Sequence, residues 1–249
     1  MRLSVSKMKL FKACRRAYEL RYIEGLTPVE TSDALQTGLT YHSKIEDLYK
    51  IGGVDMTDLS KESAMAVAYL KYIYPQFKVK ASEEWLSRDV AGNTLIGRAD
   101  GIAEDGRLVE HKTTSSEITE EYEYDLQWDE QILAYMLMTG AREIYYTVCR
   151  KPTIRQKKGE TEEEFFNRMV EWYDEDTDKK IRCMLITRTD REVAEFETEL
   201  KKMLFEISRT SNFYRNTGNC KRWGRRCEYA SVCLHYDPDE EYVEFVKED

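Results

Sequence analysis

Residues 97–114 read GRADGIAEDGRLVEHKTT, and this stretch decides the fold. It predicts two antiparallel strands joined by a short loop at residues 104–106. A three-residue hairpin loop has its last residue at positive φ, which suits Gly106. In that register Asp100 lies directly opposite Glu110, whereas a two-residue loop would turn Asp100 to the other face of the sheet.

Asp100, Glu110 and Lys112 are then expected on one side of the sheet, because Glu110 and Lys112 are two residues apart. Two close carboxylates repel each other, and a hard divalent cation such as Mg²⁺ or Mn²⁺ relieves that repulsion. A lysine beside them can orient a water nucleophile or offset charge building on a phosphate. These residues predict metal-assisted phosphodiester hydrolysis. Solvated charges on an exposed hairpin face are the simpler alternative.

Two expected helices carry further polar side chains. The helix after the hairpin, about 125–138, has Gln131 and Tyr135 one turn apart on a single face. The helix at about 34–50, which ends before a pair of glycines, carries His42, whose imidazole is a candidate nitrogen ligand for a metal. A surface histidine and a buried polar pair are the ordinary alternatives for these residues.

Periodicity and capping residues predict the remaining elements. Helices are expected from Ser4 or Ser6 to about Tyr22, after Ser60 up to Pro75, after Thr161, and from a cap at Asp190 to about Ser211. Strands are expected at about 77–90 and in the stretches REIYYTVCR and IRCMLIT. Helices, a mixed sheet with a crossover helix, and further helix indicate an α/β fold.

The composition narrows the class of protein. The chain has 249 residues, enough for a sizeable core, and a formal net charge of −9, which argues against a general cationic coat. It begins without an apolar leader, and no run approaches 18 apolar residues, so we expect neither a signal peptide nor a membrane span. A cytoplasmic location follows, and there the six cysteines are not expected to form disulfides.

Three cysteines cluster near the C-terminus, with the spacing Cys220-x6-Cys227-x5-Cys233. Unligated thiols beside arginines and lysines would be reactive, so the cluster indicates ligation of a metal group that needs a fourth ligand. A zinc site with Cys14 or His235 as that ligand is one candidate, although C-x2-C knuckles are absent. Cys149 and Cys183 lie in expected strands and are predicted to be core residues.

Six features in sequence order resemble one known family. They are a cysteine in the first helix (FKACRRAYELRYIEGL), a helical histidine (TYHSKIE), an aspartate ending GRAD, the strand VEHKTT, the helix QILAY and the terminal cysteines. The sequence resembles the PD-(D/E)XK nuclease superfamily, in its RecB-like exonuclease branch with an iron–sulfur cluster. It departs from the pattern in that no proline precedes Asp100.

The resemblance implies a restriction-endonuclease-like mixed sheet flanked by helices, and a role for each motif. His42, Asp100 and Glu110 would bind Mg²⁺ or Mn²⁺, and Lys112 would be the catalytic lysine. Gln131 and Tyr135 would belong to the catalytic set as the motif that contacts DNA.

The resemblance also implies that four cysteines hold a [4Fe–4S] cluster, with zinc as the less favoured occupant. The four would be Cys14, Cys220, Cys227 and Cys233. The cluster would clasp the first helix to the C-terminal tail and thereby lower the entropy of the unfolded chain.

Basic residues gather beside these motifs despite the acidic total. Cations with an interleaved aromatic side chain suit a single nucleic-acid strand. The candidates are Arg15, Arg16, Lys221, Arg222, Trp223, Arg225 and Arg226. A further basic loop fits nucleic-acid binding and ordinary solvated charge equally well. It contains Arg150, Lys151, Arg155, Lys157 and Lys158.

We therefore expect one nuclease domain over residues 1–249, hydrolysing DNA as an exonuclease on single strands or ends. Its parts would be a helical region (1–75), a nuclease core (76–211) with an inserted loop and helix (151–180), and a cluster-binding segment (212–249). The alternatives are a DNA-binding subunit of a recombination, repair or CRISPR-adaptation complex with little or no cleavage, and a zinc-stabilised RNA-processing nuclease. Expected partners are DNA, and either a second copy of the chain or a recombination protein, with no membrane.

Overall fold

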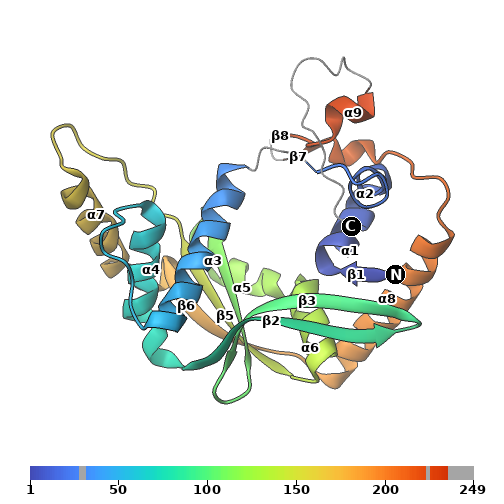
Figure 1. Ribbon diagram of the computed structural model, residues 1–249, viewed down its shortest axis with the longest axis horizontal. Coiled ribbons are helices and arrows are strands. Elements are labelled where there is room, and N and C mark those ends of the chain that lie inside the picture. Colours follow the sequence, from blue (N-terminus) through green and yellow to red (C-terminus); the bar gives the residue numbers. More distant parts are fainter. Residues whose placement is uncertain (28–31, 223–224, 235–249) are drawn as a thin grey trace. The chain divides into compact units, whose positions relative to one another are not determined.

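The computed structural model describes residues 1–27, 32–222 and 225–234 (Figure 1). The chain divides into two compact units. The first unit combines residues 1–32, 88–96 and 197–249, and the second combines residues 33–87 and 97–196.

A mixed β-sheet confirms the expected α/β class. Its strand order is β1-β3-β4-β5-β6, with β2 paired to β3; β4 and β5 run parallel, while β3–β4 and β5–β6 are antiparallel. The expected strands are all present, and the short β1 was not foreseen. The bounds are β1 Arg2–Ser4, β2 Val79–Val90, β3 Asn93–Ala103, β4 Leu108–Thr114, β5 Glu143–Arg150 and β6 Ile181–Thr187.

The hairpin between β3 and β4 has the turn that its sequence predicts. Gly106 lies at φ +88°, and its N–H donates to the Ala103 carbonyl at 2.9 Å. The register pairs Gly101 with Val109, which sets Asp100 opposite Glu110 as expected.

Helices in the second unit cover the sheet on both faces. On β4, His111 contacts Tyr49 of α3, whereas its neighbour Lys112 contacts Gln131 of α6, so α3 and α6 lie on opposite faces. α3 and α4 pack together around a core that contains Tyr41, Leu48 and Tyr69 (Figure 1). The bounds are α3 Asp33–Ile51, α4 Lys61–Tyr72, α5 Glu120–Asp125, α6 Glu130–Thr139 and α7 Glu162–Glu171.

Local capping explains where these helices begin. Ser60 caps α4, and Thr161 caps α7 through a reciprocal capping box with Glu164, as expected. α6 begins later than predicted, because Asp129 caps it and residues 126–128 form a separate 3₁₀ turn.

The first helical region differs from the single helix that was predicted. It forms α1 Val5–Ala13 and α2 Arg15–Tyr22, separated by Cys14 in an extended conformation. The side-chain amides of Asn216 and Asn219 donate to the Ala13 carbonyl, so partners about 200 residues away replace local helical bonding. Such a break carries no local sequence signal.

The C-terminal region begins with α8 Asp190–Arg209. Thr189, rather than the predicted Asp190, caps α8: its hydroxyl accepts from the Glu192 N–H, and Glu192 accepts from the Thr189 N–H. β7 Lys221–Arg222, β8 Arg225–Arg226 and α9 Ala230–Leu234 follow. Trp223 and His235 lie outside the described residues. Among the described helices, none has the length and apolar character needed to cross a bilayer.

Gly106 should be sensitive to substitution for conformational reasons alone. A Cβ at this position meets no atom within 4 Å, so Gly106→Ala adds only backbone strain at positive φ. We expect a loss of about 1–2 kcal/mol in the free energy of unfolding, measured by urea denaturation. Gly53→Ala is the matched control, because its Cβ also meets no atom and its φ is not in the left-handed region. Equal losses in both variants would contradict this account of the turn.

Candidate active site

A chain of hydrogen bonds links β4 to α6 and then to β3. The Lys112 ammonium pairs with Glu110 and donates to Gln131 Oε1 at 2.9 Å. The Gln131 amide donates to the Tyr135 hydroxyl at 2.8 Å, and Tyr135 donates to the Arg98 carbonyl. The structure therefore brings together the lysine and both polar residues of the helix that the sequence singled out.

Tyr135 and Gln131 differ in their access to a substrate. Tyr135 is 3% exposed, so its described contacts are within the protein, while Gln131 is half-buried at the start of α6. Their described bonds orient Lys112, whose side chain is 30% exposed. The ammonium is thus held in a fixed place and still open to solvent.

Glu110 is an unusually buried carboxylate. Its side chain is 2% exposed; Oε1 pairs with Lys112, and Oε2 has no hydrogen-bond partner. Burial, followed by repulsion from Asp100, raises the pKa of Glu110, and the Lys112 ammonium opposes that rise. An unpartnered buried carboxylate oxygen is costly, and a cation beside it would remove that cost.

Asp100 is held by two donors from different elements. Its Oδ1 lies 3.1 Å from His42 Nδ1 of α3, and its Oδ2 accepts from the His111 backbone N–H at 2.6 Å. Burial is the largest single influence on Asp100 and opposes its ionisation, but the hydrogen bond and charge of His42, together with the contributions of His111, outweigh it and lower the pKa of the carboxyl. Burial likewise opposes the charged form of His42, and Asp100 nevertheless raises the pKa of the imidazole.

Glu83 joins this group, although no motif in the sequence pointed to it. Ligand atoms of His42, Glu83 and Asp100 all lie within 4.8 Å of one another. Burial and the charge of Asp100 raise the pKa of the Glu83 carboxyl. Glu83 has a left-handed backbone at φ +57° within β2, a conformation that costs energy in any residue other than glycine. A regular strand pattern does not reveal such a bend, and it does not separate Glu83 from Glu84.

His111, between Glu110 and Lys112 on β4, is held by hydrogen bonds at both ring nitrogens. His111 Nε2 lies 3.0 Å from the Tyr49 hydroxyl, and Nδ1 lies 2.6 Å from Thr147 Oγ1. Burial lowers the pKa of His111 to about 4, so the ring is neutral and has one donor and one acceptor. One proton order satisfies the network: Tyr69 donates to Tyr49, Tyr49 to Nε2, and Nδ1–H to Thr147, whose hydroxyl donates to the Glu110 carbonyl.

These side chains fit a hard divalent cation. They provide one imidazole nitrogen, the clustered carboxylates of Glu83 and Asp100, and the unpartnered Oε2 of Glu110. Oxygen-rich sets with one imidazole suit Mg²⁺ or Mn²⁺. The residues predicted as ligands, His42, Asp100 and Glu110, lie in this region, with Glu83 as an addition.

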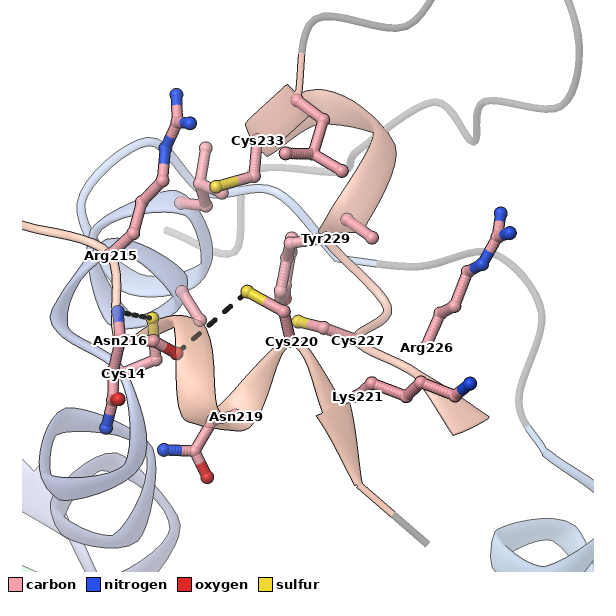
Figure 2. Close-up of a pocket in the computed structure, with 14 residues that line it drawn as sticks. Cys14, Arg215, Asn216, Asn219, Cys220, Lys221, Arg226, Cys227, Tyr229 and Cys233 are labelled. Carbon is pink, nitrogen blue, oxygen red and sulfur yellow. Dashed lines mark hydrogen bonds between the residues drawn. The ribbon is translucent and has the colours of Figure 1, made fainter. Parts of the chain in front are cut away.

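A second group lies in the first unit, where four cysteines line one cavity (Figure 2). Cys14 comes from the junction of α1 and α2, while Cys220, Cys227 and Cys233 come from the C-terminal segment. The cavity has a volume of 210 Å³. The Asn216 N–H donates to Cys14 Sγ at 3.4 Å, which joins the two segments. Cys149 is 1% exposed, and Cys183 packs against the same core, as predicted.

The basic candidates for nucleic-acid binding occupy different surroundings. Arg15 pairs with Glu206, and Arg16 pairs with Glu19 and Glu24. Lys221 and Arg226 line the cysteine cavity and are exposed. Of Arg222 and Arg225 only the backbone strands are described.

The fold and the site together define a class of protein. A mixed sheet whose adjacent strands carry an aspartate and a Glu-x-Lys motif, beside a group of metal-ligating side chains, is typical of restriction-endonuclease-like enzymes that cut nucleic acids. The chain belongs to the PD-(D/E)XK nuclease superfamily, whose family model matches residues 2–92 and 57–234. Nucleases of this superfamily use divalent metal ions.

One solved structure supports the fold, and a second is similar to this chain at a lower score. A candidate exonuclease from Eubacterium rectale shares 13% sequence identity over 97% of this chain and 90% of its own, with a TM-score of 0.52. An alkaline exonuclease from Laribacter hongkongensis shares 16% identity over 83% of this chain and 88% of its own, with a TM-score of 0.45. No curated protein sequence matches the chain.

Glu83→Gln tests the metal group directly. Because the amide removes a negative charge from the cluster, we expect the affinity for Mn²⁺ to fall roughly tenfold or more, measured by isothermal titration calorimetry. Glu84→Gln is the control, since Glu84 is its exposed neighbour on the same strand. Unchanged Mn²⁺ affinity in Glu83→Gln would remove this residue from the site.

Proposed function

We propose that this chain is a divalent-metal-dependent deoxyribonuclease of the RecB-like branch, acting as an exonuclease on single strands or DNA ends. One observation carries the proposal: a solvent-accessible lysine is fixed beside a buried glutamate and a cluster of metal-ligating side chains. Lys112, Glu110 and Asp100 form this arrangement on adjacent strands.

The proposed metal ligands are His42, Glu83, Asp100 and Glu110. A bound Mg²⁺ or Mn²⁺ would act as a Lewis acid at a phosphoryl oxygen. The ligands come from α3, β2, β3 and β4, so the sheet and its covering helix must both be folded for the set to assemble.

The protein's own groups supply the remaining chemistry. Lys112 can donate a hydrogen bond to a phosphate oxygen or to an attacking water. Glu110 opposes loss of the lysine's proton: burial disfavours the ammonium, but the charge of Glu110 keeps the pKa of Lys112 above its usual value. Gln131 and Tyr135 act as positioning residues that hold the ammonium toward the site.

We further propose that Cys14, Cys220, Cys227 and Cys233 bind a [4Fe–4S] cluster with a structural role. A single Zn²⁺ holds each thiolate at about 2.3 Å, which keeps the sulfur atoms close together. In the described part of the chain, no three cysteine sulfurs lie within 4.8 Å of one another. Wider spacing around a 210 Å³ cavity favours a larger inorganic group that bridges α1–α2 and the C-terminal segment.

The catalytic assignment predicts the behaviour of Lys112→Met. The methionine keeps most of the side-chain volume but has no ammonium, so we expect kcat on single-stranded DNA to fall about 10²- to 10³-fold. Activity is measured by release of acid-soluble nucleotides with Mg²⁺ or Mn²⁺, and wild-type activity should vanish in EDTA.

Lys201→Met is the control, because Lys201 is a half-exposed lysine that pairs with Glu197 on α8. Its activity should equal that of the wild type, and thermal melting should show that Lys112→Met is folded. Metal-dependent cleavage that persists in Lys112→Met refutes the assigned role. Metal and DNA binding by the wild type without any cleavage would instead support a DNA-binding subunit, and preference for RNA would support an RNA-processing nuclease.

The cluster proposal predicts colour. Protein purified without oxygen should be brown and contain iron, and Cys227→Ser should lose both while lowering the melting temperature. Cys183→Ser should retain the iron, because Cys183 packs in the core of the second unit. Colourless wild-type protein with stoichiometric zinc would overturn the cluster and leave the hydrolytic site untouched.

A further inference from the structure

Trp85 is a large aromatic side chain left in solvent beside the candidate metal group. It lies on β2 two residues after Glu83 and is 67% exposed. A single exposed aromatic residue is common and needs no function. The surroundings of Trp85 set it apart from an ordinary exposed aromatic residue.

Arg98 connects Trp85 to the metal group. Its guanidinium lies 5.9 Å from the centre of the Trp85 ring, and its Nε lies 2.7 Å from Glu83 Oε2. Arg98 is two residues before Asp100 on β3, and its side chain is 49% exposed. One flexible cation therefore contacts both the aromatic face and a carboxylate of the site.

The bend in β2 accounts for this placement. Glu83 has a left-handed backbone, and its carbonyl accepts a hydrogen bond from Arg98 Nε at 3.3 Å. Strained residues persist only where surrounding structure holds them, and here the Arg98 contact is part of that structure. The left-handed conformation thus places Glu83 in the metal group, and Trp85, two residues later, is exposed.

An aromatic ring and a guanidinium side by side match the chemistry of one nucleotide. The phosphate pairs with the cation and the base stacks on the ring, provided that the base is not already paired and stacked in a duplex. A strand whose phosphate reached Lys112 would pass close to Asp100, and the neighbouring nucleotide would be within reach of Arg98.

We propose that Trp85 and Arg98 bind the nucleotide next to the scissile phosphate and select unpaired strands, Trp85 by stacking on its base and Arg98 by pairing with its phosphate. This inference rests on the proposed nuclease function, and it assigns the preference for single strands to two residues.

The first experiment compares Trp85→Ala with the wild type on a single-stranded oligonucleotide at saturating Mg²⁺. Loss of one stacking contact should raise KM roughly 5- to 150-fold with little change in kcat. An oligonucleotide with abasic sites should raise KM of the wild type to a similar extent and should not raise KM of Trp85→Ala further. KM on single strands unchanged by Trp85→Ala would overturn the inference.

Arg98→Ala separates phosphate binding from orientation of Glu83. Loss of one phosphate contact should reduce the slope of log KM against log salt concentration by about 0.7. Arg98→Lys should restore most of that slope. If Arg98→Ala instead changes only the Mg²⁺ concentration required for activity, Arg98 is a positioning residue for Glu83 and its phosphate role is refuted.

The chain provides a matched control pair on α8. Phe205 is 60% exposed and has the Arg209 guanidinium 4.5 Å from its ring centre, and neither residue is a member of the metal group. Phe205→Ala and Arg209→Ala should leave KM and its salt slope unchanged. Equal effects in both pairs would show nonspecific surface binding and would overturn the inference.

Strand binding is also measured by fluorescence anisotropy in EDTA, where the proposed function predicts no cleavage. If the wild type never cleaves, the proposed function fails, yet weaker anisotropy binding by Trp85→Ala still supports the nucleotide contact. If the wild type cleaves and Trp85→Ala binds and cleaves equally well, the proposed nucleotide contact is refuted and the proposed nuclease function stands.

Discussion

The ion pair between Lys112 and Glu110 is the interaction on which the candidate site depends. A carboxylate with 2% exposure is expensive to leave alone, and removing one partner of a buried pair typically costs about 3–5 kcal/mol. The ammonium neutralises one oxygen and leaves the other without a partner. The same pair therefore fixes the lysine and maintains a demand for positive charge at the place where a metal ion would bind.

The surrounding elements that the structure describes leave Oε2 of Glu110 without a hydrogen-bond partner. α6 satisfies the lysine through Gln131, and α3 satisfies Asp100 through His42. Behind β4, the neutral ring of His111 ties the strand to Tyr49 and Thr147 without adding charge. The contacts of Gln131 and His111 thus fix geometry without neutralising a carboxylate, and Oε2 of Glu110 remains available to a cation.

The sequence predicts the parts of the site that obey local rules. The hairpin register follows from Gly106, and the shared face of Gln131 and Tyr135 follows from helical spacing. Glu83 could not be predicted, because its place depends on a left-handed residue inside a strand. The break at Cys14 was missed for a related reason, since the Ala13 carbonyl is bound by asparagines about 200 residues away. The periodicity of a short stretch of sequence contains no information about backbone strain or about hydrogen-bond partners far away in the chain.

The left-handed backbone at Glu83 also limits which substitutions can raise the thermal stability of the protein. Asparagine tolerates left-handed geometry better than glutamate does, so selection for thermal stability would favour Glu83→Asn and remove a carboxylate from the proposed metal site. This chain therefore carries a residue that is unfavourable for its backbone conformation. At Glu83 the stability of the fold and the proposed metal binding favour different residues. Libraries designed to raise stability should therefore leave Glu83 unchanged.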